Sequence, residues 1–111
     1  MVLSGWSERV WVSSQPVDMR KGCFSLAALV EREFSLDPRS ACVFVFFART
    51  MDKVKLLYWD RTGFVLTYKC LAKGRFRVPK MQGVGYRLSL SDLNCLLEGI
   101  DLMDKQRLHA V

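Results

Sequence analysis

Cations gather in the second half of the chain, where their density would suit binding to phosphate groups. The segment from residue 49 to 87 holds ten of the seventeen lysines and arginines but only two of the eleven acidic residues. It therefore carries a net charge of +8, while the rest of the chain carries −2. Such a one-sided field attracts nucleic acid, anionic lipid or an acidic protein. The plainer alternative is that lysines and arginines only solvate the outer surfaces of strands.

Aromatic residues are interleaved with these cations in "KLLYWDRTGFVLTYK", residues 55–69. Exposed rings beside lysines can stack on the bases of single-stranded nucleic acid, but the same rings can also pack in a core with their polar tips at the surface. Further on, "AKGRFRVPK" places three cations on one face of an extended chain. The candidate nucleic-acid-binding residues are Arg20, Lys21, Arg49, Lys53, Lys55, Arg61, Lys69, Lys73, Arg75 and Arg77.

The chain lacks the residue groups that common enzyme classes need, and we predict that it is not an enzyme and takes no metal or cofactor. The single histidine, His109, lies in the expected C-terminal tail, which argues against a histidine-based triad. The Gly83–Gly85 stretch lacks the Lys-Ser/Thr of a phosphate-binding loop. Asp52 and Asp60 stand at opposite ends of an expected strand, roughly 26 Å apart, too far to share metal ions.

Four cysteines at positions 23, 42, 70 and 95 form no Cys-x-x-Cys pair and lie in apolar contexts, so we expect buried, reduced thiols. The longest apolar run, residues 41–48, is far shorter than the roughly 20 residues of a membrane-spanning helix. The first ten residues have neither the basic start nor the apolar block of a signal peptide. These features predict a cytoplasmic protein without a membrane segment.

Alternating apolar residues predict a short strand at 8–14 and a three-stranded antiparallel meander at 42–47, 53–59 and 64–71. A fourth strand is expected at 84–90. In the meander we expect one core built from two rows and a basic outer face opposite to it. The rows are Val54, Leu56 and Tyr58 with Phe64, Leu66 and Tyr68; the basic outer face consists of Lys53, Lys55, Arg61 and Lys69.

Two helices are expected beside these strands. The first follows Asp18 as its N-terminal cap, with Arg20 and Lys21 in its first turn. Its apolar stripe would consist of Phe24, Ala27, Val30 and Phe34. The second would begin at Ser91-Asp92 and end before Gly99. We therefore predict a single α+β domain over residues 1–111, with an antiparallel sheet of four to five strands, two helices and a mobile tail from about residue 103 to 111.

Several stretches, taken in order, resemble one family of proteins. They are "VWV", "DMRKG" followed by "LAALV", "VFVF", "DKVKLLYWD" with "GF" soon after, "YK" with "KGRF" and a proline, and "DLNCLLEGID". Together they resemble the small accessory protein TnpB, encoded by the second open reading frame of insertion sequence 66 (IS 66) family elements of bacteria. The likeness runs from about residue 9 to 102. The chain departs from the family pattern in having one arginine in the turn at 48–52 and Val78 where tryptophan is common.

The resemblance implies a role in transposition, and thus in DNA recombination, in a bacterial cytoplasm in association with the nucleoid. It implies as partners the element-encoded transposase and a second small accessory protein. It supplies no catalytic residues.

Two functions remain open from the sequence. The first is a DNA-binding accessory protein that contacts phosphates through a basic sheet face. The second is an interaction module that docks the transposase or the other accessory protein without binding DNA itself. Trp6, Trp11 or Leu102-Met103 would serve it as anchors, and a sheet edge could pair with another copy to form a homodimer.

Overall fold

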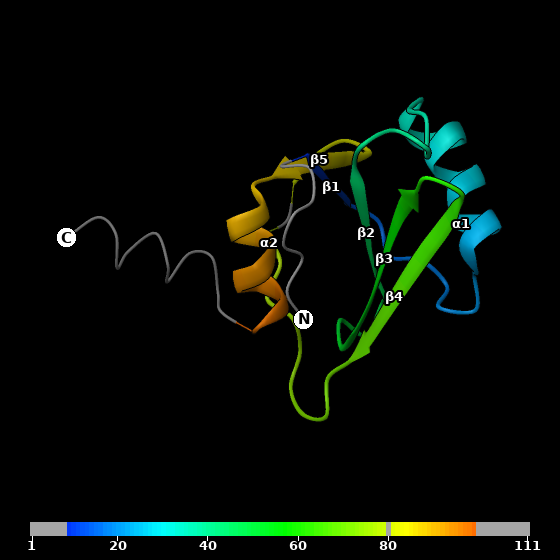
Figure 1. Cartoon of the computed structure of the whole chain (residues 1–111). Helices are drawn as coiled ribbons and strands as arrows, with labels where there is room; N and C mark the ends of the chain where they lie inside the picture. Colours follow the sequence, from blue (N-terminus) through cyan, green and yellow to red (C-terminus); the bar gives the residue numbers. More distant parts are fainter. Residues whose placement is uncertain (1–8, 80, 100–111) are drawn as a thin grey trace.

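The computed structural model describes residues 9–79 and 81–99, and these fold into one sheet with helical segments packed on both of its faces (Figure 1). Trp6, Lys80, Leu102, Met103, His109 and the expected tail lie outside the described residues. The elements in chain order are β1 Val10–Ser13, α1 Cys23–Leu29, a π-helical continuation η1 Val30–Phe34, β2 Val43–Phe47, β3 Lys53–Asp60, β4 Gly63–Cys70, β5 Gly85–Leu88 and α2 Leu90–Leu97.

The sheet has the strand order β4-β3-β2-β1-β5, which confirms the α+β class and the meander of β2, β3 and β4. The expectation of an antiparallel sheet is wrong for one pair, because β1 and β2 run parallel. The chain between them contains α1 and η1, and a helical crossover of this kind is what parallel neighbours require. β5 then pairs antiparallel with β1, so the last strand closes the far side of the sheet.

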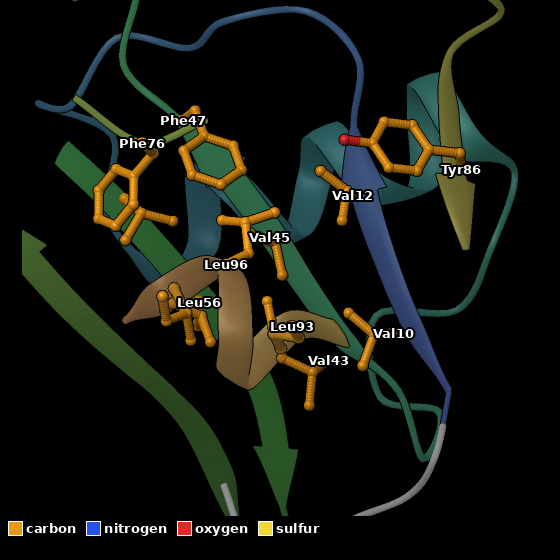
Figure 2. Packing of buried hydrophobic residues seen from close by; sticks show 12 residues of the cluster. Val10, Val12, Val43, Val45, Phe47, Leu56, Phe76, Tyr86, Leu93 and Leu96 are labelled. Carbon is orange, nitrogen blue, oxygen red and sulfur yellow. The ribbon is translucent and has the colours of Figure 1, made fainter. Parts of the chain in front are cut away.

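Both faces of the sheet are covered, which explains why β2 is apolar at every position and fully buried. On one face Leu26 and Val30 pack against Phe44 and Phe46. On the other face Leu93 and Leu96 of α2 form the centre of a second cluster (Figure 2). That cluster takes residues from all strands except β4 and also includes Phe76, which lies in the segment after β4.

The first helix differs from its prediction at its start and in its apolar face. It begins at Cys23 with Gly22 as the capping position, whereas Asp18 forms a turn in which its side chain accepts the backbone N–H of Arg20 at 2.9 Å. A short aspartate side chain can satisfy nearby backbone donors without starting a helix. Phe24 is 82% exposed and lies outside the buried stripe, which runs through Leu26, Ala27, Leu29 and Val30.

The second helix begins earlier in the chain than predicted. Ser89 is the N-cap in place of Ser91, and the Ser89 hydroxyl accepts the backbone N–H of Asp92 at 3.0 Å. Gly99 has a φ of 86°, as expected for the residue just after a helix end.

The four cysteines are free thiols, but the expectation that all are buried holds in full only for Cys42: Cys23 and Cys95 are half-buried, and Cys70 is exposed. Cys70 is exposed because it is the last residue of β4, at the border of the sheet, where no neighbouring strand covers it.

Among the glycines in the described part of the chain, Gly85 is the one at which an added Cβ atom would collide with the fold. A Cβ atom there would lie 2.7 Å from the carbonyl oxygen of Val12 and 3.3 Å from the ring of Phe34. We expect Gly85→Ala to lower the free energy of unfolding by about 1–3 kcal/mol, because the β1–β5 pair must shift to make room. Gly63→Ala is the matched control, since no atom lies within 4 Å of its added Cβ. Urea denaturation of both variants would contradict the prediction if their midpoints moved equally.

Candidate nucleic-acid interface

The register of β3 and β4 shows that the predicted basic outer face does not exist as one surface. Lys55 lies opposite Tyr68, and Lys69 lies opposite Val54. Directly opposed residues of antiparallel strands share a face, so Lys53 and Lys55 lie on the α1 side and Lys69 on the α2 side. For the same reason the two rows predicted to form one core, that of Val54 and that of Phe64, lie on opposite faces.

Lys55 is buried, with 7% of its surface exposed, and it holds a loop in place. Its Nζ donates to the carbonyl oxygens of Met19 at 2.6 Å and Lys21 at 2.8 Å. The same ammonium lies 4.9 Å from the ring centroid of Tyr68. The backbone conformation of the "DMRKG" loop is therefore tied to the middle of the sheet by one lysine.

Two further candidates are also engaged within the fold. Lys69 donates from its Nζ to the carbonyl oxygen of Leu97 at 2.6 Å, at the last residue of α2, where a cation complements the helix dipole. Lys53 lies 3.1 Å from both carboxylate oxygens of Asp52. Hydrogen bonding to Thr50 and Lys53 lowers the pKa of the Asp52 carboxyl.

Arg61 is exposed but stands apart from the other candidates. It occupies the turn between β3 and β4 with a φ of 51°. That turn is at the opposite end of β3 from Lys53, and the eight residue steps between Lys53 and Arg61 separate the two by roughly 26 Å.

Four exposed cations gather at the other end of the sheet, where β2 and β4 end and β3 and β5 begin. The turn at 48–52 contributes one of them and the segment at 71–79 the other three. We call this surface the basic loop end; its cations are Arg49, Lys73, Arg75 and Arg77. Within the described part of the chain none of the four makes an ion pair.

The segment at 71–79 is irregular, yet it is fastened to the neighbouring turn. Leu71 donates its backbone N–H to the carbonyl oxygen of Asp52 at 2.8 Å, and Phe76 donates to that of Met51 at 2.6 Å. The buried ring of Phe76 packs edge-on against Phe47, with 5.5 Å between centroids (Figure 2). The prediction of one extended run with three cations on a face is wrong at Gly74, whose φ of 83° bends the chain.

Two shallow hollows lie among these loops. One, of about 720 Å³, is lined by Met51 and residues 74–79 and includes Arg75 and Arg77. The other, of about 600 Å³, has Arg49 in its lining. Both share an apolar floor made by Met51, Phe76, Val78 and Pro79. The basic loop end thus combines long cationic side chains with a concave apolar base.

Sequence reasoning missed the polar side chains of the second hollow, among them Ser14, Gln15 and Tyr86. The Tyr86 hydroxyl donates to the carbonyl oxygen of Pro79 at 3.2 Å, and burial raises the pKa of Tyr86 to about 12. Ser14 bonds to the backbone at Gly83. No sequence signal marks these residues, because their meeting depends on the pairing of β1 with β5.

The loop that carries Arg20 and Lys21 starts at the same end of the sheet, since Val17 donates its N–H to the carbonyl oxygen of Phe47. Arg20 is highly exposed but contacts Asp18, with Nη2 to Oδ2 at 2.6 Å. The hydrogen bonds from Arg20 lower the pKa of the Asp18 carboxyl to about 2. This pairing offsets the charge of Arg20, so Lys21 is the less neutralised cation of the loop.

Residues 9–79 and 81–99 contain no group of three or more histidine, cysteine, aspartate or glutamate side chains placed to hold a metal ion. None of the helices in these residues is long and apolar enough to cross a membrane.

The fold and this surface together define the class of the protein: a small α+β domain with exposed cations at the basic loop end. The chain belongs to the family described as IS66 Orf2 like protein, whose model matches residues 8–107, and so it is an accessory protein of a transposable element. It is 36% identical over 93 residues to "Uncharacterized protein y4jC" of Sinorhizobium fredii, covering 84% of this chain and 80% of that one. It is 38% identical over 101 residues to "Uncharacterized protein y4hO" of the same organism, covering 91% and 88%. No solved structure matches the chain.

Proposed function

We propose that the chain assists transposition of its element by binding DNA phosphates with the basic loop end, and that it performs no catalytic step itself. The observation that carries this proposal is the fastening of the segment at 71–79 to the turn at 48–52. It holds four exposed cations together at one end of the sheet, without ion pairs to described residues. Lys21 and Arg20 extend the positive surface toward the α1 side.

The geometry favours contact with the DNA backbone over reading of bases. Sequence is read mainly by arginine, asparagine or glutamine side chains that a helix or ribbon carries into the major groove. The helical stretch of α1 and η1 includes only Arg32, which is paired with Glu33, and α2 includes only the half-buried Asn94. We therefore expect similar affinity for the terminal repeats of the element and for unrelated duplexes of equal length.

Lys53, Lys55 and Lys69 have a different part in this proposal from that of the four exposed cations. Their ammonium groups are engaged with Asp52 or with backbone carbonyls. They support the loops and the helix end beside the phosphate-binding side chains and add to the local field. Arg61, at the opposite end of the sheet, would meet DNA only where the duplex extends around the molecule.

The test is fluorescence anisotropy of labelled duplex DNA across a salt series. We expect the triple variant Lys73→Gln, Arg75→Gln, Arg77→Gln to bind more weakly than the native chain. Its plot of log affinity against log salt should be shallower by about 0.9 for each phosphate that the variant no longer neutralises.

The matched control removes three cations elsewhere, with Arg32→Gln, Arg39→Gln and Arg61→Gln. These three side chains are exposed and lie away from the basic loop end. Equal reductions of affinity in the two triple variants would contradict a localised interface and leave only a general effect of net charge. Absence of binding at low salt would overturn the proposal in favour of docking to the transposase.

A further inference from the structure

The strand β4 forms the border of the sheet, and among the described residues no strand pairs with its outer edge (Figure 1). A two-residue turn joins it to β3, so Asp60 and Gly63 form a hydrogen-bonded pair and every second pair from there is bonded in the same way. Phe64, Leu66, Tyr68 and Cys70 consequently direct their N–H and C=O groups away from β3. No backbone hydrogen bond within residues 9–79 and 81–99 reaches these outward groups.

The edge of β4 lacks the features by which soluble proteins discourage strand pairing. Proteins protect such edges with prolines, bulges, charged side chains or very short strands. β4 has eight residues without proline, and its register with β3 is unbroken. Its single charged side chain, Lys69, is bonded to the carbonyl oxygen of Leu97. The opposite border, β5, has only four residues and carries the exposed Arg87.

We propose that β4 pairs antiparallel with β4 of a second copy of the chain, so that the two sheets become continuous across a twofold axis. Because these outward groups must bond to one another, even-numbered residues of the two strands lie opposite each other, and we place the twofold axis at Leu66. Leu66 lies opposite the partner's Leu66, and Phe64 lies opposite the partner's Tyr68. The backbone groups of Phe64, Leu66 and Tyr68 then find bonds in the other copy.

This register is complementary in both shape and charge. On the α1 side it forms a row of apolar and aromatic pairs, which are favourable cross-strand neighbours. Phe24 extends that row: its ring is 82% exposed and its centroid lies 6.1 Å from that of Phe64. On the α2 side Val65 faces the partner's Thr67, and Lys69 faces the partner's Gly63. No two cations of the paired strands stand directly opposite each other, although each chain has a net charge of +6.

The occupant that best fits this edge is therefore a second copy and not an unrelated peptide, because the strand is complementary to itself. The association is separate from the DNA contact, since the basic loop end is formed by loops beyond the strand ends. In the dimer the two basic loop ends would be related by the twofold axis, and a dimer could engage two DNA segments or two parts of one.

The first experiment is sedimentation velocity of the full chain over a range of concentrations. We expect twice the mass of one chain for the native protein. We expect the mass of one chain for Tyr68→Glu, because a carboxylate at this edge would face the partner's Phe64. Tyr68→Glu should remain folded, since Tyr68 is 48% exposed and its neighbour on β3 is Lys55. The control is Val84→Glu, a change at a side chain that is 47% exposed and outside β4.

The second experiment tests the register directly. In a Cys70→Ser background, Leu66→Cys should form a disulfide-linked dimer under mild oxidation, because hydrogen-bonded antiparallel partners have Cα atoms about 5.5 Å apart. Thr67→Cys in the same background should not, since that residue faces the partner's Val65.

A native protein that stays monomeric, or a dimer that Tyr68→Glu leaves intact, would overturn the proposal. The proposal would also be overturned if the native protein were monomeric and Tyr68→Glu lowered its affinity for DNA. The row of Phe64, Leu66 and Tyr68 would then be assigned to stacking on bases. Unchanged DNA binding in the triple variant of the basic loop end, with the native chain still dimeric, would overturn the proposed function and leave the dimer proposal standing.

Discussion

Replacement of Lys55 by methionine is expected to lower the free energy of unfolding by about 2–4 kcal/mol. The variant lacks two charge-assisted hydrogen bonds, each of which contributes about 1.5–3 kcal/mol. It also leaves the carbonyl oxygens of Met19 and Lys21 without the donor that they share. The apolar surface of methionine recovers part of this stability, because the lysine stem is already buried at 7% exposure.

The matched control for this prediction is Lys53→Met, two residues earlier on the same face of β3. Lys53 is partly exposed and its ammonium pairs with Asp52, and such exposed pairs contribute about 0–1 kcal/mol. Thermal and urea denaturation of both variants provide the measurement. The loop held by Lys55 should also become a faster site of trypsin cleavage, at Arg20 or Lys21. Equal stability of the two variants would refute the role given to Lys55.

The alternation of apolar residues along the chain and the turn-forming residues between the runs were enough to predict most strands of the sheet. Phe44, Phe46 and their neighbours form a short run that is apolar at every position and rich in valine and phenylalanine, which favours a strand covered on both faces. The turn from Asp60 to Gly63 predicted the β3–β4 hairpin in its correct place. The parallel pairing of β1 with β2 was not predictable in this way, because it depends on where the chain returns after α1.

The faces of β3 and β4 show why the candidate site was only partly predictable. The alternation of side chains indicates which residues of one strand share a face. It does not indicate which face of the neighbouring strand lies on the same side of the sheet. That relation depends on the register across the turn, and here it pairs Lys55 with Tyr68. Charge alone likewise does not distinguish a lysine that binds a ligand from one that caps backbone carbonyls. Lys55 and Lys69 belong to the second kind by their geometry, whereas Arg75 and Arg77 are exposed.

Phe76→Ala should weaken both the fold and the DNA contact without a change in net charge. The ring is 3% exposed and packs against Phe47, and truncation of a buried phenylalanine costs about 3–5 kcal/mol. The truncation also frees the chain on either side, where Arg75 and Arg77 lie. If binding DNA must then order one more residue, at a cost of about 1–2 kcal/mol, the affinity falls roughly tenfold.

Two comparison variants separate this effect from a simple decrease in folded protein. Phe76→Leu retains most of the apolar packing and should keep the chain folded at the temperature of the binding measurement, with an affinity between those of the native chain and Phe76→Ala. Arg75→Gln should lower the affinity and leave the denaturation midpoint unchanged, since its side chain is exposed and makes no ion pair with described residues. If folded Phe76→Leu and folded Phe76→Ala bound DNA as tightly as the native chain, the fastening of the segment at 71–79 would have no part in recognition. A graded decrease in affinity would instead show that an apolar anchor with no charge of its own determines how well its cationic neighbours bind phosphate.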